Sequence, residues 1–225
     1  MEEKLSSEEQ EKEGFFMAAA IIRIANSPRG RRRTLLKQTS QTKMDKKLGA
    51  EELRIKTPTE EDLKRVKQTR QEIYIVLDDV LDTYNIGSIF RLADAVGAKK
   101  IYLCRGSETP PNTRIQKASI GTWQWVEWQY FADAKSAISN IKYQISNIRI
   151  IGIELDKRAI DYTKANYILP VALVVGHESN GISKEVLNMC DEIVQLPMMG
   201  INKSLNVMVS LGIVLYEVLE KNKSK

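Results

Sequence analysis

Apolar residues from Glu72 onward fall into short continuous runs that alternate with stretches of helical spacing. The short runs predict strands at 73–77, 100–104, 125–131, 148–155, 171–176 and 192–197. The helical spacing predicts helices at 86–97, 133–144, 183–190 and from Leu205 onward. The strands at 148–155 and 171–176 are mainly continuous apolar runs, which is typical of strands buried on both faces. This alternating order predicts an α/β domain with a mostly parallel sheet.

The first 71 residues lack this patterning and divide by charge. Residues 1–13 contain six glutamates, whereas residues 14–43 contain seven Lys or Arg and no acid. Such a segment is typical of a disordered or loosely helical tail. Two alternatives stay open, a basic arm that contacts phosphates and a protein that begins at Met44. We therefore predict a basic, flexible segment at 1–43, a charged helical region at 44–71 and a folded domain at 72–225.

The charged region contains a helix start. Thr57 is placed to cap, Pro58 suits the first helical position and Glu60 completes a capping box, so we expect a helix that ends near Gln71. Its basic residues are predicted to form either a solvated face or a rim that faces the substrate; they are Lys64, Arg65, Lys67 and Arg70.

Net charge and cysteine content narrow the class of protein. A net charge of +5 and a pI of about 9.1 suit a polyanionic partner without identifying one. Cys104 and Cys190 lie far apart in apolar contexts, with neither a disulfide framework nor zinc spacing, which fits a reducing cytoplasm. The apolar run at 15–22 is too short to span a bilayer, and acidic sequence precedes it where a signal peptide would be basic. We expect a cytoplasmic protein with no membrane segment.

Polar segments that contain glycine follow three of the predicted strands: "DDVLDTYNIGSIFR", "GHESNGIS" and "PMMGINKSLN". Because ligands bind beyond the carboxyl ends of parallel strands, these segments predict the site. The sequence has no G-x-G-x-x-G after a strand and no P-loop, which argues against a Rossmann dinucleotide site and an NTPase. The single histidine, His177, has no second imidazole with which to share a metal, so we expect no metal site and no histidine triad.

These segments together resemble the motifs of the SpoU, or TrmH-like, family of RNA 2′-O-ribose methyltransferases in the SPOUT superfamily. The similar stretches are "NIGSIFRLADAVGAKKIYL", "LVVGHESNGIS" and "IVQLPMMGINKSLNVMVSLGIVLYE", in the family's order over roughly residues 72–220. The resemblance implies a trefoil knot in the C-terminal part of the sheet and S-adenosylmethionine as the cofactor. It also implies a homodimer with the active site at the subunit interface, and transfer RNA or ribosomal RNA as the substrate.

The resemblance assigns catalytic positions to Asn85, Arg91, Glu178, Ser204 and Asn206, with Arg91 acting at the ribose 2′-hydroxyl. A guanidinium is too basic to accept a proton readily, so we expect Arg91 to position the hydroxyl and to stabilise the developing alkoxide. Glu178 is expected to orient an arginine. On local grounds alone, Arg91 also suits a surface salt bridge, Asn85 a helix N-cap and Glu178 the first turn of a helix.

The resemblance further implies a cofactor site made by Ile153, Gly176, Leu196 and Leu205, the last three largely through backbone groups. On local grounds Leu196 and Leu205 equally suit the core. Methyl transfer from a sulfonium needs neither a protein nucleophile nor a metal, which fits motifs rich in glycine, amide and hydroxyl groups.

Two other functions stay open. One is a SPOUT enzyme that methylates a base nitrogen, which the Asn85–Arg91 pair and the S-L-N signature disfavour. The other is a catalytically silent RNA-binding assembly factor, which predicts RNA binding without cofactor binding.

Overall fold

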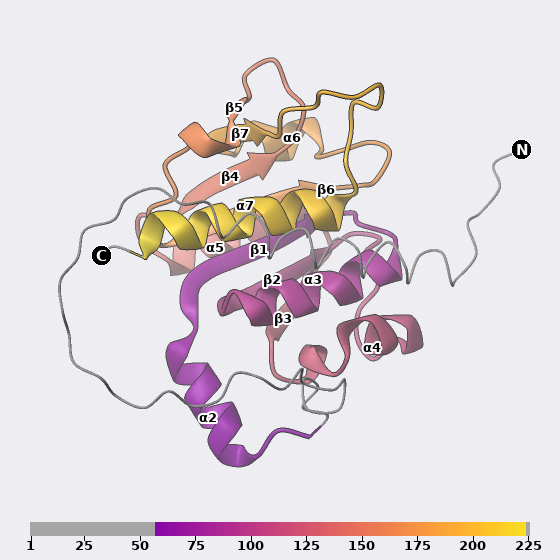
Figure 1. Cartoon of the computed structure of the whole chain (residues 1–225), viewed down its shortest axis with the longest axis vertical. Coiled ribbons are helices and arrows are strands. Elements are labelled where there is room, and N and C mark those ends of the chain that lie inside the picture. Colours follow the sequence, from indigo (N-terminus) through magenta and orange to yellow (C-terminus); the bar gives the residue numbers. More distant parts are fainter. Residues whose placement is uncertain (1–56, 224–225) are drawn as a thin grey trace, which may run out of the picture. The chain divides into compact units, whose positions relative to one another are not determined.

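A single parallel sheet organises the computed structural model, which describes residues 57–223; the predictions for 1–43 and for 44–56 lie outside the described residues. These residues belong to one compact unit. Seven strands follow the order β3-β2-β1-β6-β4-β7-β5, and every neighbouring pair is parallel (Figure 1). The predicted α/β class with a parallel sheet is confirmed.

The elements have the following bounds. The strands are β1 (Gln71–Asp78), β2 (Ala98–Cys104), β3 (Glu127–Phe131), β4 (Arg149–Ile153), β5 (Ile160–Asp161), β6 (Val171–Gly176) and β7 (Glu192–Gln195). The α-helices are α2 (Glu60–Thr69), α3 (Thr83–Ala95), α4 (Thr113–Ser119), α5 (Ala134–Gln144), α6 (Lys184–Leu187) and α7 (Val207–Asn222). Two short 3₁₀ helices, η1 (Thr122–Gln124) and η2 (Tyr162–Lys164), complete the set.

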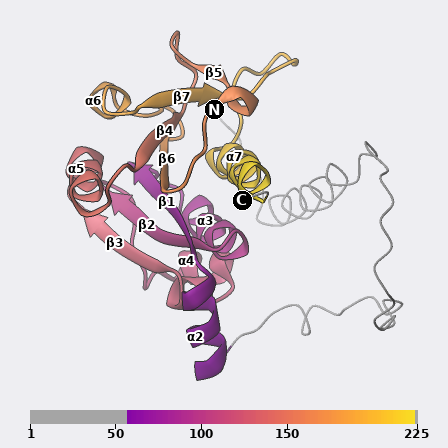
Figure 2. The ribbon, with the colours of Figure 1, turned by 90° about the vertical axis from the view of Figure 1, so that its left-hand side faces the viewer.

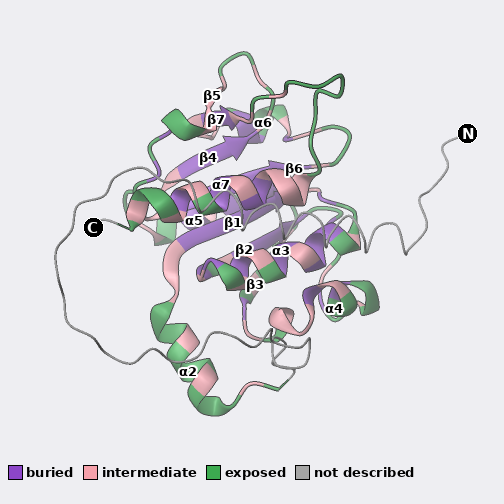
Figure 3. Cartoon of the chain, in the orientation of Figure 1, coloured by how far each residue is buried: buried purple, intermediate pink, exposed green. Residues whose placement is uncertain are grey.

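Helices cover both faces of the sheet. Side chains alternate along each strand, so both faces carry apolar side chains that the helices bury. In β1, Ile73, Ile75 and Leu77 join one buried cluster, which includes residues of α3 and α7. Tyr74 and Val76 point to the opposite face and join a second cluster with residues of α5 and α6. Figure 2 shows α3 and α7 on one side of the strands and α5 on the other. Figure 3 shows the central strands buried between these layers, whereas α2 has no buried residue.

The starts of α2, α3 and α7 differ from the predictions by two or three residues, and those of α5 and α6 by one. Thr59, not Thr57, caps α2, and Asp62, not Glu60, completes the capping box. Both Thr57 and Thr59 are followed three residues later by an acid, so the sequence allows a capping box at either position. The helix uses the later one, which leaves Pro58 outside it. Asp82 caps α3 and accepts a hydrogen bond from the Tyr84 N–H at 2.8 Å. Asn85 is therefore an interior residue of α3, and its interpretation as an N-cap is wrong.

The sequence patterns did not predict several short elements. They are α4, η1, β5 and η2, each of seven residues or fewer. Such short segments offer too few positions for a periodic pattern. The packing of α4 matters for the site, because it lies against α3 at Gly87. A Cβ built at Gly87 would lie 2.6 Å from the Ala118 Cβ and 2.8 Å from the Ile115 carbonyl oxygen.

Candidate active site

Four neighbouring strands bring the predicted segments to one edge of the sheet. β1, β6, β4 and β7 are adjacent and parallel, so the segments that follow them all leave from their carboxyl ends. The segment after β1 leads into α3, and the segments 177–183 and 196–206 follow β6 and β7. The three polar segments predicted from sequence therefore share this edge.

Asn85, Glu178 and Asn206 join these segments directly, and we call this group the polar bridge. The Asn206 amide donates to the Asn85 Oδ1 at 3.1 Å, and the Asn85 amide donates to the Glu178 Oε1 at 3.0 Å. Asn85 is 6 % exposed, so its two amide contacts satisfy a side chain that would be costly to bury unpaired. Hydrogen bonds thus connect three predicted catalytic residues, one from each of three separate segments, with Asn85 in the middle.

Glu178 is held by amide donors. Its carboxylate also accepts hydrogen bonds from the backbone N–H groups of Leu81 and Asp82, at 3.2 and 3.1 Å. Burial alone would raise the pKa of Glu178, but the hydrogen bonds from Asn85 and from backbone N–H groups outweigh it and lower the pKa below the usual 4.5. The carboxylate is therefore ionised at neutral pH, and it ties the start of α3 to the segment after β6.

Asn206 performs two roles at once. Its Oδ1 accepts a hydrogen bond from the Met208 N–H at 2.9 Å and caps α7, while its Nδ2 reaches Asn85. One side chain therefore both starts the last helix and completes the polar bridge. Ser204 lies two residues earlier on the exposed segment 196–206. The contacts of the polar bridge do not include it.

Two carboxylates that were not predicted brace the segment after β6. Buried Asp78, at the end of β1, accepts hydrogen bonds from the Ser183 N–H and hydroxyl at 2.9 and 2.7 Å. Glu154, just after β4, accepts one from the Ile182 N–H at 2.7 Å. Acids directly after apolar strands were the available signal, but sequence does not reveal which distant N–H group each one binds.

The four predicted cofactor residues lie at the ends of neighbouring strands or on the segment after β7. Ile153 ends β4 and is 9 % exposed, and Gly176 ends β6. Leu196 follows β7 and is half-buried, whereas Leu205 is 40 % exposed. The alternative that Leu205 is a core residue is therefore wrong. An exposed leucine beside accessible backbone suits an apolar ring whose edge is read by backbone groups.

Gly176 lies unusually close to the chain that returns past it. A Cβ at this position would lie 2.2 Å from the Gly181 carbonyl carbon and 2.3 Å from both the Gly181 oxygen and the Ile182 nitrogen. Gly181 itself has a φ of +66°. The hairpin-like turn between them, with hydrogen bonds between His177 and Gly181 in both directions, depends on glycine at both ends.

Arg91 stands apart from the polar bridge. It is an exposed residue of α3, six positions after Asn85, or about 9 Å along the helix axis. There it lines a groove of about 390 Å³ between α2, α3 and the segment around η1. The structure therefore brings together Asn85, Glu178 and Asn206, and it places Arg91 further along the same helix.

The histidine and the two cysteines are not arranged for catalysis. The His177 Nδ1 accepts hydrogen bonds from the Ser179 and Asn180 N–H groups at 3.0 and 3.3 Å. Burial raises the pKa of the Cys104 and Cys190 thiols to about 12, so both are protonated at neutral pH. Over residues 57–223 no cluster of three His, Cys, Asp or Glu residues is arranged to hold a metal. In the same range no helix is both long and apolar enough to cross a membrane.

Known proteins resemble this chain over the same region. It is 32% identical to the Bacillus subtilis protein YacO, of the TrmH family of tRNA/rRNA methyltransferases, over 69% of this chain and 61% of YacO. It is 29% identical to the tRNA (guanosine(18)-2′-O)-methyltransferase of Aquifex aeolicus, over 72% of this chain and 76% of that protein. It is 30% identical to the 23S rRNA (guanosine-2′-O-)-methyltransferase RlmB of Acinetobacter baylyi, over 70% and 64%. The chain thus spans less than two thirds of the length of two of these curated relatives.

Solved structures share the fold. The A. aeolicus TrmH/SpoU tRNA modifying enzyme superposes with a TM-score of 0.65 at 28% identity, over 73% of this chain and 84% of that chain. An AdoMet-bound rRNA methyltransferase from Sinorhizobium meliloti gives a TM-score of 0.62 at 27% identity, over 71% and 60%. The model of the SpoU rRNA Methylase family matches residues 72–216, which include the whole polar bridge and Arg91. The chain therefore belongs to the SpoU rRNA methylase family.

Proposed function

We propose that this protein transfers a methyl group from S-adenosylmethionine to a ribose 2′-hydroxyl of transfer RNA or ribosomal RNA. The observation that carries the proposal is the polar bridge, in which the family's motif residues from three segments meet at one sheet edge. The names of the A. aeolicus and A. baylyi relatives, a tRNA and a 23S rRNA 2′-O-methyltransferase, support the ribose as the acceptor. A cytoplasmic location is part of the same proposal.

The cofactor site in this proposal consists of Ile153, Gly176, Leu196 and Leu205. Its fit rests on the exposed apolar side chain of Leu205 and on the position of Ile153 and Gly176 at the carboxyl ends of neighbouring strands. The AdoMet-bound S. meliloti relative supports the choice of cofactor. When bound, S-adenosylmethionine supplies an already activated methyl group, so the chain's task is to position the acceptor.

The catalytic residues divide by role. Asn85, Glu178 and Asn206 act as positioning residues that hold the three segments in register. Ser204 lies on the exposed segment before the N-terminus of α7, where a phosphate or ribose hydroxyl is favoured. Arg91 acts at the ribose 2′-hydroxyl by positioning it and by stabilising the alkoxide as the proton leaves.

We propose also that the C-terminal part of the sheet is threaded as a trefoil knot. The sheet order supports this, because β6 lies between β1 and β4 while β7, later in the chain, lies beyond β4. An experimental density map in which residues 148–216 do not pass through a loop of the chain would contradict the knot.

A homodimer is part of the same proposal. Apolar side chains are exposed on the segment 196–206 and on α7, where Met199 is 95 %, Ile201 98 % and Tyr216 42 % exposed. A second copy of the chain that covers this surface would remove a large apolar area from water. Sedimentation at micromolar concentration should give about twice the chain mass of 25.6 kDa. A stable and active monomer would contradict it.

Mapping of the methylated atom tests the proposed function. RNA from cells with and without this gene should differ by one or more ribose methyl groups, and calorimetry should show S-adenosylmethionine binding that EDTA leaves unchanged. A methyl group on a base nitrogen would identify the base-methylating alternative. RNA binding without cofactor binding would identify the silent assembly factor. Loss of cofactor binding on chelation would point to a metal.

A further inference from the structure

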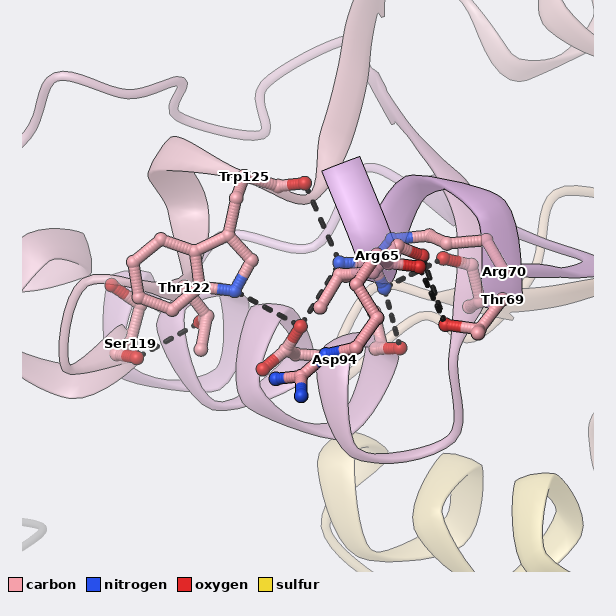
Figure 4. Close-up of polar contacts among 10 residues, drawn as sticks. Arg65, Thr69, Arg70, Asp94, Ser119, Thr122 and Trp125 are labelled. Carbon is pink, nitrogen blue, oxygen red and sulfur yellow. Dashed lines mark hydrogen bonds and ion pairs between the residues drawn. The ribbon is translucent and has the colours of Figure 1, made fainter. Parts of the chain in front are cut away.

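The groove that contains Arg91 has walls from three separate elements. We call it the α2–α3 groove; it is lined by Pro58, Asp62, Leu63, Arg65, Val66, Arg91, Asp94, Ala95, Ser119, Ile120, Thr122 and Trp125. Its volume, about 390 Å³, lies within the range of small-ligand sites. Figure 4 shows Arg65 of α2, Asp94 of α3 and Trp125 together in this region.

The groove combines apolar and cationic surface. Leu63, Val66 and Ile120 supply aliphatic side chains, and the Trp125 indole is half-buried among them. Arg65 and Arg91 bring two guanidinium groups from opposite helices. Apolar and aromatic surface beside arginine is the combination that accepts a nucleotide, with the base on the apolar wall and the phosphate at the guanidinium.

The two carboxylates of the groove are already engaged by the protein. Asp94 accepts hydrogen bonds from Arg70 at 2.9 Å and from the Trp125 Nε1 at 3.0 Å. The Asp62 carboxylate accepts hydrogen bonds from the Thr59 N–H and hydroxyl at 3.2 and 2.8 Å, and it forms an ion pair at 2.9 Å with Arg65, whose side chain is 69 % exposed. An exposed arginine of this kind keeps donors for a phosphate, because a guanidinium carries five N–H groups.

Buried Arg70 fixes the walls relative to one another. Its side chain is 6 % exposed and donates to Asp94, to the Ala98 carbonyl at 3.0 Å and to the Trp125 carbonyl at 3.4 Å (Figure 4). It therefore links the end of α3, the start of β2 and the segment before β3. The suggestion that Arg70 forms part of an exposed rim is wrong, whereas Arg65 does face the groove.

We propose that the α2–α3 groove holds a nucleotide of the substrate RNA next to the one that is methylated, with its phosphate at Arg65. The inference rests on the proposed function, since it assumes that the acceptor ribose lies at Arg91. Because neighbouring nucleotides are covalently joined, an RNA with its acceptor ribose at Arg91 has an adjacent nucleotide within reach of the groove, which Arg91 itself lines. α2 is thus a substrate-binding element.

The test compares two alanine variants one position apart. Arg65 lines the groove and Lys64 does not, although both are exposed cations of α2. With bulk transfer RNA or purified ribosomal RNA as the probe, whichever the parent binds, Arg65→Ala should weaken binding about five- to tenfold and reduce the slope of log affinity against log salt by about one. Lys64→Ala should change affinity less than about twofold, and both variants should bind S-adenosylmethionine like the parent.

A second variant tests the apolar wall. Leu63 is 40 % exposed, so Leu63→Glu should fold normally while it places a negative charge in the groove and weakens RNA binding at least as much as Arg65→Ala. Equal affinities for Arg65→Ala, Lys64→Ala and the parent would overturn the proposal. RNA binding is measured separately from methyl transfer. A parent protein that binds RNA but methylates no ribose would contradict the proposed function, and the affinities of the variants would still test the groove.

Discussion

Replacement of Arg91 by alanine is expected to lower the single-turnover rate of methyl transfer at least about a hundredfold, the usual effect of losing one positioned oxyanion or proton-transfer group. Its neighbours Ile89, Phe90 and Ala93 are fully buried in the core, whereas Arg91 is exposed and lines the α2–α3 groove, where a substrate can reach it. Affinity for S-adenosylmethionine should be nearly unchanged, because the proposed cofactor residues lie on other segments.

Two further variants show whether the effect belongs to chemistry. Arg91→Lys should restore little of the rate, since an ammonium does not reproduce the planar guanidinium fork. Asn85→Ala breaks both contacts of the polar bridge and should lower cofactor affinity together with rate. A single-turnover assay at saturating cofactor separates the two effects. Parental rates in Arg91→Ala would make Arg91 a docking or structural residue.

Replacement of Gly176 by alanine should disrupt the turn after β6. The added Cβ would overlap backbone atoms of Gly181 and Ile182 at 2.2 to 2.3 Å, and backbone cannot move aside as a flexible side chain does. We expect a loss of about 1–3 kcal/mol of stability, or roughly 2–12 °C in Tm. S-adenosylmethionine affinity should fall at least about tenfold, because the displaced turn carries Glu178 and borders the proposed cofactor site.

Gly200→Ala is the matched control. A Cβ at Gly200 meets no atom within 4 Å, and it lies on the segment after β7 that also borders the site. The same change of residue there should alter stability by less than about 0.5 kcal/mol. Differential scanning calorimetry and cofactor titration of both variants decide the matter. Equal stability and equal cofactor affinity of the two variants would show that the turn at Gly176 accommodates a Cβ without loss of stability.

Long apolar runs allowed most of the sheet to be predicted from sequence. The strand 171–176 has its predicted bounds, and the others agree to within a few residues, because a strand buried on both faces needs an unbroken apolar run. The three polar segments were also located correctly, since topology alone brings the ends of parallel strands to one edge. These features depend on local pattern and on general rules of α/β sheets.

Features set by contacts between distant residues were not predicted. Arg70 looked like one basic residue among several in a charged helix, yet it is buried by contacts with Asp94, Ala98 and Trp125, far along the chain. Glu178 was expected to orient an arginine, but its hydrogen bonds come from Asn85 and from two backbone N–H groups. No local pattern specifies which partner folding brings to such a side chain.

The residue types in the polar bridge bear on how the rate of methyl transfer should depend on pH. Two of its members are amides, which do not titrate, and the third, Glu178, has a lowered pKa. A carboxylate with a lowered pKa contributes its stabilisation above its unfolded pKa and loses it only as the pH falls through the folded value. Between about pH 6 and 9 the bridge therefore keeps one charge state. A change in methylation rate across that interval would therefore have a source other than titration of the polar bridge.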